Sequence, residues 1–261
     1  MNETVAKEYQ EYKEQDRIWG LIDPERITAI KFPRIDKAII EAFLEIEDVT
    51  STVSDVLDSM GICGAVPASL IGPVIPGKRV AGTAVTLRNI PERNSVYKNF
   101  TDHNTIRMTT RDIQYMAEPG DILVIDGGGR TDISNIGGQS CLVTKTCGLA
   151  ASVVYGAVRD IGSIREMDHP TWAMGGTPIT GKFRIEAIQI NGPVTFGPIQ
   201  ILPGDLIIAD DSGIVAIPAD KAEEVLKAVQ ETTEMERKME DLIKSGASFQ
   251  ELKELHRQRY K

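Results

Sequence analysis

The chain has 261 residues, of which 41% are hydrophobic, and its formal net charge at pH 7 is −9. A sizeable core is expected from this length and composition, whereas the acidic balance argues against a nucleic-acid partner, which would need a basic face. The sequence holds no apolar run long enough to cross a bilayer, its N-terminus is unlike a signal peptide, and its three cysteines fit no zinc spacing. We therefore expect a cytoplasmic protein with no nucleic-acid and no membrane partner.

The first half of the chain shows mainly helical periodicity. Its first helix is charged, carries little apolar surface, and is either solvated or packed on another subunit. On the fourth helix, Arg107 and Arg111 stand four residues apart, and of a cationic patch and a solvated face we expect the solvated face. The elements predicted in this half are helices at 1–17, 33–47, 51–61 and 95–116, and a strand at 80–87.

The second half mixes strands with helices. Ile122–Ile125 is an unbroken apolar run of strand type, followed by the glycines at 127–129 and by a helix that should begin near Ile136. This helix would bury Cys141 and Cys147 as small core residues. No Pro- or Ser-rich linker divides the chain, so we predict one domain with helical extensions at both ends. The other elements predicted here are strands at 152–155 and 171–174, a hairpin at 206–217, and helices at 161–167, from 219 and from 248.

Two segments nearly repeat each other. Pro119–Asp126 reads P-G-D-I-L-V-I-D, and Pro203–Asp210 reads P-G-D-L-I-I-A-D. Each predicts a turn followed by a buried strand that ends in Asp. Because only this local unit recurs, the sequence predicts neither a solenoid nor tandem domains.

The candidate functional residues lie at the ends of the central strands. The strand at 152–155 delivers Arg159 and Asp160 to one sheet edge, and ligands bind at such edges in open α/β sheets. An Arg fork binds carboxylates, an Asp holds hard divalent cations, and the free N–H groups of a helix near 136–139 accept an anion. The alternative is a structural salt bridge at a strand end. Lys182, on a second Gly-rich loop, is either a third cation of the site or a surface lysine.

These motifs resemble the RraA-like family, named after the regulator of ribonuclease activity A, which includes the 4-hydroxy-4-methyl-2-oxoglutarate aldolases. The similarity rests on G-D-I-L-V-I-D-G-G-G, on the twenty residues between Gly138 and Arg159, and on P-G-D-L-I-I-A-D-D-S-G-I-V-A-I-P. It covers about residues 49–239 of a single domain, so that 1–48 and 240–261 flank a compact core. The resemblance implies an α/β fold of the swivelling β/β/α type, assembled as a homotrimer or hexamer with active sites between subunits.

For the site, the aldolase branch implies Mg²⁺ or Mn²⁺ held by Asp160, largely through waters, and a small 2-oxo acid bound by Arg159 at its pyruvoyl part. Asp55 and Glu236 match carboxylates that a neighbouring subunit contributes, with Glu236 as a further metal ligand. Lys182 matches a family lysine in a loosely aligned loop. The backbone implied to take the substrate's carboxylate is that of Ile136, Gly137, Gly138 and Gln139.

Two positions depart from the aldolase pattern. The family continues R-D-x-x-[DE], where this chain has Ser163, and many aldolases carry an acidic residue at the position of Gly138. Both changes remove negative charge that would orient metal-bound water or move protons. One hypothesis is therefore a divalent-metal-dependent lyase that acts on a small 2-oxo acid through a metal-stabilised pyruvate enolate, as an aldolase or oxaloacetate decarboxylase, or a related enzyme on a different small carboxylate. The other is a non-catalytic regulator that binds proteins.

Overall fold

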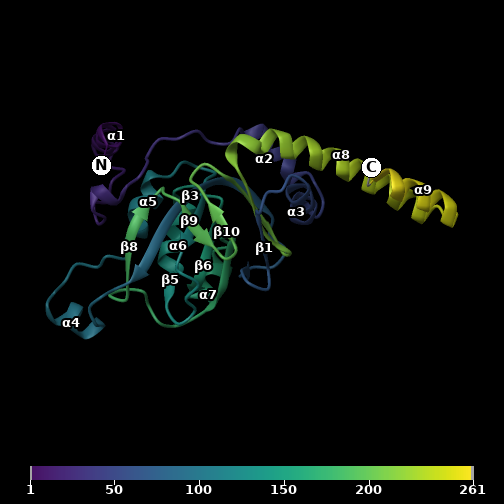
Figure 1. The fold of residues 1–261 in the computed structure, drawn as a ribbon. Coiled ribbons are helices and arrows are strands. Elements are labelled where there is room, and N and C mark those ends of the chain that lie inside the picture. Colours follow the sequence, from purple (N-terminus) through teal and green to yellow (C-terminus); the bar gives the residue numbers. More distant parts are fainter. Residues whose placement is uncertain (1, 260–261) are drawn as a thin grey trace.

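A ten-stranded mixed sheet forms the centre of the protein, whose computed structural model describes residues 2–259 (Figure 1). The strands lie in the order β1-β12-β11-β3-β4-β6-β7-β2, with β5 beside β6 and β8 beside β3. The long β3 joins the two halves, because it pairs antiparallel with β11 at one end and parallel with β4 further along. The strands of this sheet are β1 Ala65–Pro67, β2 Gly72–Pro73, β3 Val80–Pro91, β4 Ile122–Asp126, β5 Ser134–Ile136, β6 Ala151–Val158, β7 Thr171–Gly176, β8 Ile185–Ile190, β11 Leu206–Asp210 and β12 Gly213–Ile217. The strands β9 Val194–Phe196 and β10 Ile199–Ile201 pair as a separate two-stranded sheet.

Helices cover both halves of this sheet. In one half α6 packs against α5, α7 and β6, and in the other α3 packs against α8, β11 and β12. Apolar side chains of α2, α3 and α8, such as Phe43, Leu57 and Val225, form a core with β11 and β12 and are fully or almost fully buried. The helices are α1 Glu3–Glu14, α2 Lys37–Leu44, α3 Val49–Ser59, α4 Val96–Thr101, α5 Thr110–Met116, α6 Gly138–Thr146, α7 Ile161–Glu166, α8 Ala222–Lys244 and α9 Phe249–Arg259, with 3-10 turns at Pro24–Arg26 and Ala219–Lys221.

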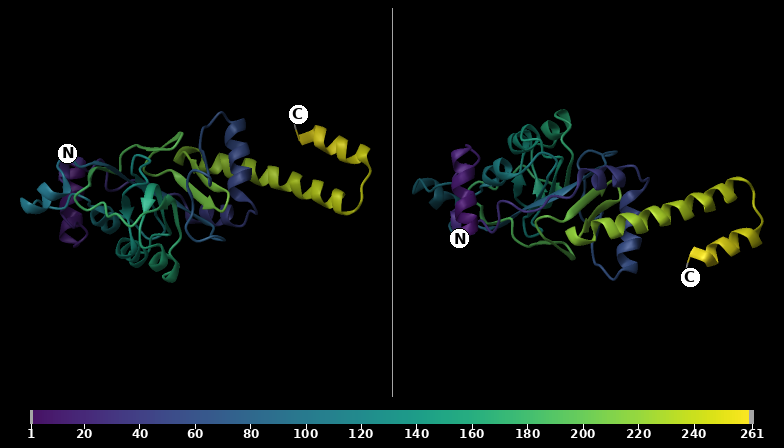
Figure 2. Two further views of the ribbon diagram at one scale, coloured as in Figure 1. Left: turned by 90° about the horizontal axis from the view of Figure 1, so that it is seen from below. Right: turned by 90° about the horizontal axis from the view of Figure 1, so that it is seen from above.

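The C-terminal helices project from the body as an arm. Figure 2 shows α8 leaving the body and α9 turning back beside it. Only residues of the first turns of α8 are buried, namely Ala222, Val225 and Val229. Within the described residues, no helix has the length and apolar character needed to span a membrane. The predicted α/β fold with helices at both ends is confirmed.

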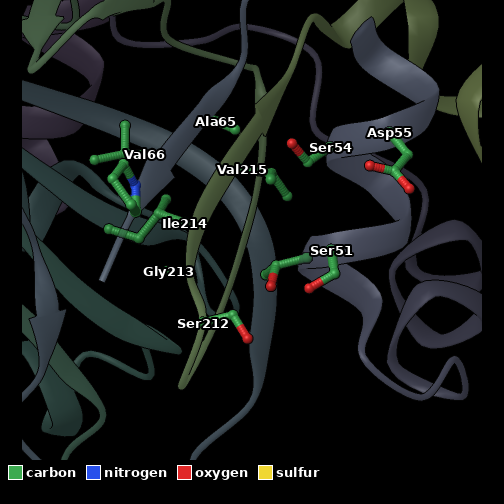
Figure 3. Close-up of a pocket in the computed structure, with 11 residues that line it drawn as sticks. Ser51, Ser54, Asp55, Ala65, Val66, Ser212, Gly213, Ile214 and Val215 are labelled. Atoms are coloured by element: carbon green, nitrogen blue, oxygen red, sulfur yellow. The ribbon is translucent and has the colours of Figure 1, made fainter. Parts of the chain in front are cut away.

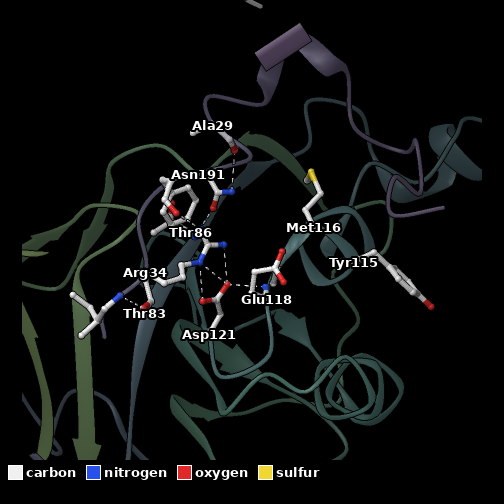
Figure 4. A network of polar contacts seen from close by, with 12 residues as sticks. Ala29, Arg34, Thr83, Thr86, Tyr115, Met116, Glu118, Asp121 and Asn191 are labelled. Carbon is white, nitrogen blue, oxygen red and sulfur yellow. Dashed lines mark hydrogen bonds and ion pairs between the residues drawn. The ribbon is translucent and has the colours of Figure 1, made fainter. Parts of the chain in front are cut away.

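The N-terminal segment is fastened to the body by two buried carboxylates. Asp112, on α5, accepts hydrogen bonds from the N–H groups of Gly20, Leu21 and Ile22. Burial raises the pKa of this carboxyl, although the three donors oppose the shift. Asp121, just before β4, is paired with Arg34, whose Nε and Nη2 lie 3.0 Å from its two oxygens (Figure 4). The segment is thus held at α5 and at the turn just before β4.

The sequence repeat is also a structural repeat. Asp121 and Asp205 each accept a 2.8 Å hydrogen bond from the N–H three residues earlier. The glycine before each has a left-handed φ, 90° at Gly120 and 98° at Gly204, which only glycine adopts at little cost. The strands that follow, β4 and β11, lie on either side of β3 and are buried throughout. The predicted unit of turn and buried strand is confirmed at both places.

Several predicted boundaries need correction. The helix predicted at 95–116 is two short helices, because the chain between them turns at His103 (φ 52°) and then lies against β8, where the N–H of Ala187 donates to the carbonyl of Arg107. The strand predicted at 152–155 is the longer β6. The helix predicted to begin near Ile136 begins at Gly138, since Ile136 is the last residue of β5 and pairs with Val158.

Candidate functional site

The glycine loop after β4 packs against two side chains of the body. A Cβ at Gly127 would lie 2.3 Å from Nδ2 of Asn135, and one at Gly129 would lie 2.9 Å from the hydroxyl of Tyr155. Asn135 is buried and accepts a hydrogen bond from Asn89. The glycines therefore allow a tight turn between β4 and β5, which sets the start of α6.

Helix α6 begins directly beside the Arg159–Asp160 pair. Because β5 and β6 run parallel, they bring Gly137 and Arg159 to the same sheet edge. A Cβ at Gly137 would lie 2.6 Å from Cγ of Arg159 and 2.7 Å from Oδ2 of Asp160, so only glycine allows this approach. Asp160 adopts a left-handed φ of 56° and accepts the N–H of Gly138 at 3.0 Å. One N–H of the predicted anion seat is therefore occupied by a carboxylate of the chain itself.

The predicted salt bridge within this pair is present and weak. Nε of Arg159 lies 3.4 Å from Oδ2 of Asp160, and the two side chains are 41% and 44% exposed. Ion pairs this exposed stabilise a fold by only about 0–1 kcal/mol. Stability alone therefore gives little reason for an Arg at this place, and its guanidinium retains donors for a ligand.

A cavity of about 270 Å³ opens at the N-terminus of α6. Four residues of the predicted site line it, namely Arg159, Gly137, Gln139 and Lys182. Asp160 lies next to Gly137 but does not line the cavity. Ile136 does not line it either, because its side chain is fully buried. The remaining lining residues are Ile106, Met108, Thr110, Arg111, Ser140 and Thr180.

Arg111 is a site residue that sequence reasoning missed. It lines the cavity, and its Nη1 donates to Oε1 of Gln114 at 3.0 Å. Gln114 is fully buried and donates in turn to Ser140 and Thr144 of α6. The sequence placed Arg111 on a helix, but the face of that helix depends on how α5 packs against α6, which no local pattern specifies. The cavity thus receives three cations, from α5, from the end of β6 and from the loop before β8.

Known proteins resemble this chain in sequence and in fold. The RraA-like (Aldolase/RraA) family model matches residues 50–216. The chain belongs to the RraA-like family. Two solved structures share its fold. The first, an uncharacterised protein from Pseudomonas syringae, has a TM-score of 0.70 and 25% identity, and the match covers 85% of this chain and 100% of that one. The second, an unusual Streptomyces coelicolor member of the RNase ES inhibitor RraA family, has a TM-score of 0.66 and 27% identity, and the match covers 79% of this chain and 98% of that one.

Two curated relatives share sequence with this RraA-like chain. The Legionella pneumophila protein DlpA is 29% identical over 205 residues, which are 78% of this chain and 32% of that protein. A Halalkalibacterium halodurans protein named "Putative 4-hydroxy-4-methyl-2-oxoglutarate aldolase" is 31% identical over 178 residues, which are 68% of this chain and 76% of that protein. The chain therefore spans about a third of the length of DlpA and three quarters of the aldolase relative.

The two departures from the RraA-like aldolase pattern lie side by side. A Cβ at Gly138 would lie 3.1 Å from Cβ of Ser163 and 3.4 Å from Cβ of Asp160. Ser163 is exposed on the first turn of α7. Acidic residues at both positions would place two further carboxylates beside Asp160 at the start of α6. The structure thus shows that the two losses affect a single patch.

Asp55 and Glu236 lie away from this cavity. Asp55 is exposed on α3 and lines a different hollow of about 340 Å³, between α3 and the β1–β12 pair (Figure 3). Glu236 is on α8, in the C-terminal arm. Within one chain neither joins Arg159 and Asp160, so their predicted roles require a second subunit and stay predictions.

A metal ion at this site would have one protein carboxylate nearby. In the described part of the chain, no three His, Cys, Asp or Glu side chains are grouped to hold a metal. Asp160 offers a half-exposed carboxylate. Mg²⁺ keeps several waters and is commonly held by one or two carboxylates together with substrate oxygens. The donors fit such a water-rich site, while a closed cage built from one chain is excluded among these residues.

Proposed function

We propose that this RraA-like chain is a divalent-metal-dependent carbon–carbon lyase that acts on a small 2-oxo acid. The observation that carries the proposal is the convergence of Arg111, Arg159 and Lys182 on one small cavity without an acidic lining residue. Such a cavity attracts a small anion, because a cleft lined by charges of one sign concentrates their field. The name of the aldolase relative supports the same class of substrate.

In this proposal each residue at the cavity and the start of α6 has a role of its own. Arg159 binds the carboxylate and keto oxygens and adds positive charge where negative charge collects when the bond breaks. The first N–H groups of α6 that remain free, near Gln139, contribute donors to the same carboxylate. Asp160 holds Mg²⁺ or Mn²⁺ through water, and Lys182 adds a further positive charge. When bound, the ion supplies Lewis-acid stabilisation of the 2-oxo group.

Decarboxylation of oxaloacetate is the reaction that these residues support best. The bond to the departing CO₂ breaks, its electron pair remains as the enolate of pyruvate, and a proton then adds to C3. Aldol cleavage needs in addition a base that takes the proton of the C4 hydroxyl. Of the three neighbouring positions at the start of α6, Gly138 and Ser163 carry no carboxylate, which leaves Asp160 for this task. We therefore expect decarboxylation to exceed aldol cleavage.

The test is pyruvate release from oxaloacetate and from 4-hydroxy-4-methyl-2-oxoglutarate, with Mg²⁺, with Mn²⁺, and with a chelator. Rates are corrected for metal-catalysed decarboxylation without protein. Arg159→Met should lower kcat/KM about 10- to 100-fold, as expected for the loss of a charge-assisted hydrogen bond. Arg93→Met is the matched control, since Arg93 is exposed and lies outside the cavity. The lyase proposal fails if the wild type is inert with every 2-oxo acid and binds no pyruvate by calorimetry with Mg²⁺.

A regulator that binds other proteins is the second candidate. It is supported by the missing carboxylates at Gly138 and Ser163 and by the RNase inhibitor family named for the Streptomyces relative. A pure binding protein has no use for a cavity lined by three cations. Absence of both turnover and pyruvate binding would therefore favour the regulator.

A further inference from the structure

Two of the three cations in the cavity have no acidic partner. Among the described residues, neither Arg111 nor Lys182 takes part in an ion pair, and the cavity lining contains no carboxylate. Arg107, four residues earlier and outside α5, differs from Arg111 because it is paired with Glu92 and Glu186 at 2.6 Å. The charge of the cavity therefore exceeds what a single substrate carboxylate neutralises.

Arg111 is held at the cavity by a buried residue. Oε1 of Gln114 accepts from Nη1 of Arg111 at 3.0 Å, while its Nε2 donates to Oγ of Ser140 at 3.0 Å and to Oγ1 of Thr144 at 2.7 Å. Ser140 belongs to the first turn of α6, where the first carboxylate is proposed to bind. Gln114 thus fixes Arg111 relative to that seat and leaves the other guanidinium donors for a ligand.

A second, independent observation lies beside Arg111. The hydroxyl of Thr110 has no hydrogen-bond partner among the described residues, although Thr110 is only 5% exposed. Thr110 lines the same cavity. Buried polar groups of folded proteins nearly always have a partner, so this hydroxyl leaves one unmet hydrogen bond in the wall beside Arg111. Ile106 and Met108 add an apolar stretch of wall that suits the carbon chain between two charged ends.

We propose that Arg111 is a specificity-determining residue, positioned by Gln114, that binds a second anionic group of the substrate while Arg159 binds the 2-oxo acid end. This inference rests on the proposed function and adds to it the residues that select diacids over monoacids.

Two non-cleavable ligands of equal chain length provide the test. 2-Oxoglutarate carries a second carboxylate and 2-oxopentanoate does not. Their dissociation constants are measured by calorimetry with Mg²⁺, for the full-length wild type, Arg111→Gln, Arg111→Lys and Gln114→Met. Arg93→Gln is the control, because it makes the same charge change at an exposed place outside the cavity.

Arg111→Gln should weaken the binding of 2-oxoglutarate about 10- to 100-fold, because a charge-assisted hydrogen bond is lost. The same change should weaken the binding of 2-oxopentanoate by less than about threefold, because only a remote charge is removed. Arg111→Lys should retain part of the preference, and Gln114→Met should reduce the ratio of the two constants without abolishing 2-oxopentanoate binding. Equal weakening of both ligands, or no change, would overturn the role of Arg111 and leave the lyase proposal standing. A wild type that binds neither ligand nor pyruvate, and that turns over no 2-oxo acid, would instead overturn the lyase proposal itself.

Discussion

The buried pair Arg34–Asp121 should contribute more to stability than any exposed ion pair of the chain. Asp121 is 3% exposed and Arg34 is 22% exposed, and two 3.0 Å hydrogen bonds join them (Figure 4). Removing one partner of a buried pair leaves the other charge uncompensated and typically costs about 3–5 kcal/mol. Because Arg34 is partly solvated, we expect Arg34→Met to lower the free energy of unfolding by about 3 kcal/mol, the lower end of this range.

The sequence repeat provides a matched control. Asp205 makes the same turn as Asp121 but, among the described residues, has no cationic partner; its second oxygen accepts the N–H of Ala219 instead. Asp205→Asn keeps one acceptor and should cost only about 1 kcal/mol, the net value of one hydrogen bond. Asp121→Asn added to Arg34→Met should restore part of the loss, because it removes the uncompensated charge.

The assay is urea unfolding at one fixed protein concentration, since oligomerisation shifts apparent stability. With a slope of about 3 kcal/mol per molar, the expected midpoint change for Arg34→Met is about 1 M. Burial raises the pKa of Asp121, and Arg34 opposes that rise. A carboxyl whose pKa is raised in the folded state lowers stability as pH rises through that pKa, and has no such effect while it is protonated in both states. The free energy of unfolding lost in Arg34→Met should therefore be smaller at pH 4 than at pH 7. A loss below 1 kcal/mol, or one independent of pH, would refute this reasoning.

Four further predictions concern the site and the assembly. Asp160→Asn keeps an acceptor for the N–H of Gly138 and suits the left-handed φ, so it should remove Mg²⁺ stimulation of turnover without unfolding; full stimulation would contradict the metal assignment. Ser163→Asp restores a carboxylate beside Gly138 and should raise cleavage of 4-hydroxy-4-methyl-2-oxoglutarate by up to about 100-fold; unchanged rates together with weaker ligand binding would indicate another substrate. Light scattering should find a trimer or a multiple of it, and an active monomer would argue against a shared site. Burial raises the pKa of Cys141 to about 12, so at pH 8 a thiol reagent should modify exposed Cys63 quickly and Cys141 only after unfolding.

Much of the site could be predicted from the sequence, because its parts depend on local chemistry. The apolar run 122–125, the glycines after it and the helix that follows are set by residues within a few positions of each other. Parallel strands end at a common edge, so Arg159 had to reach the start of α6, and the cavity at that place contains it together with Lys182. The repeated turn at Asp121 and Asp205 is likewise encoded within four residues.

Tertiary structure decided the features that depend on contacts between distant segments. The break before Thr110 follows from pairing of Arg107 with β8, and the orientation of Arg111 follows from Gln114 contacting Ser140, 26 residues away. The closeness of Gly138 and Ser163 arises only when α6 and α7 begin at the same sheet edge. Periodicity reports which side of an element is apolar, whereas the partner that covers it depends on the whole chain. The sequence therefore determined the elements and the edge at which ligands bind, and packing determined which side chains meet there.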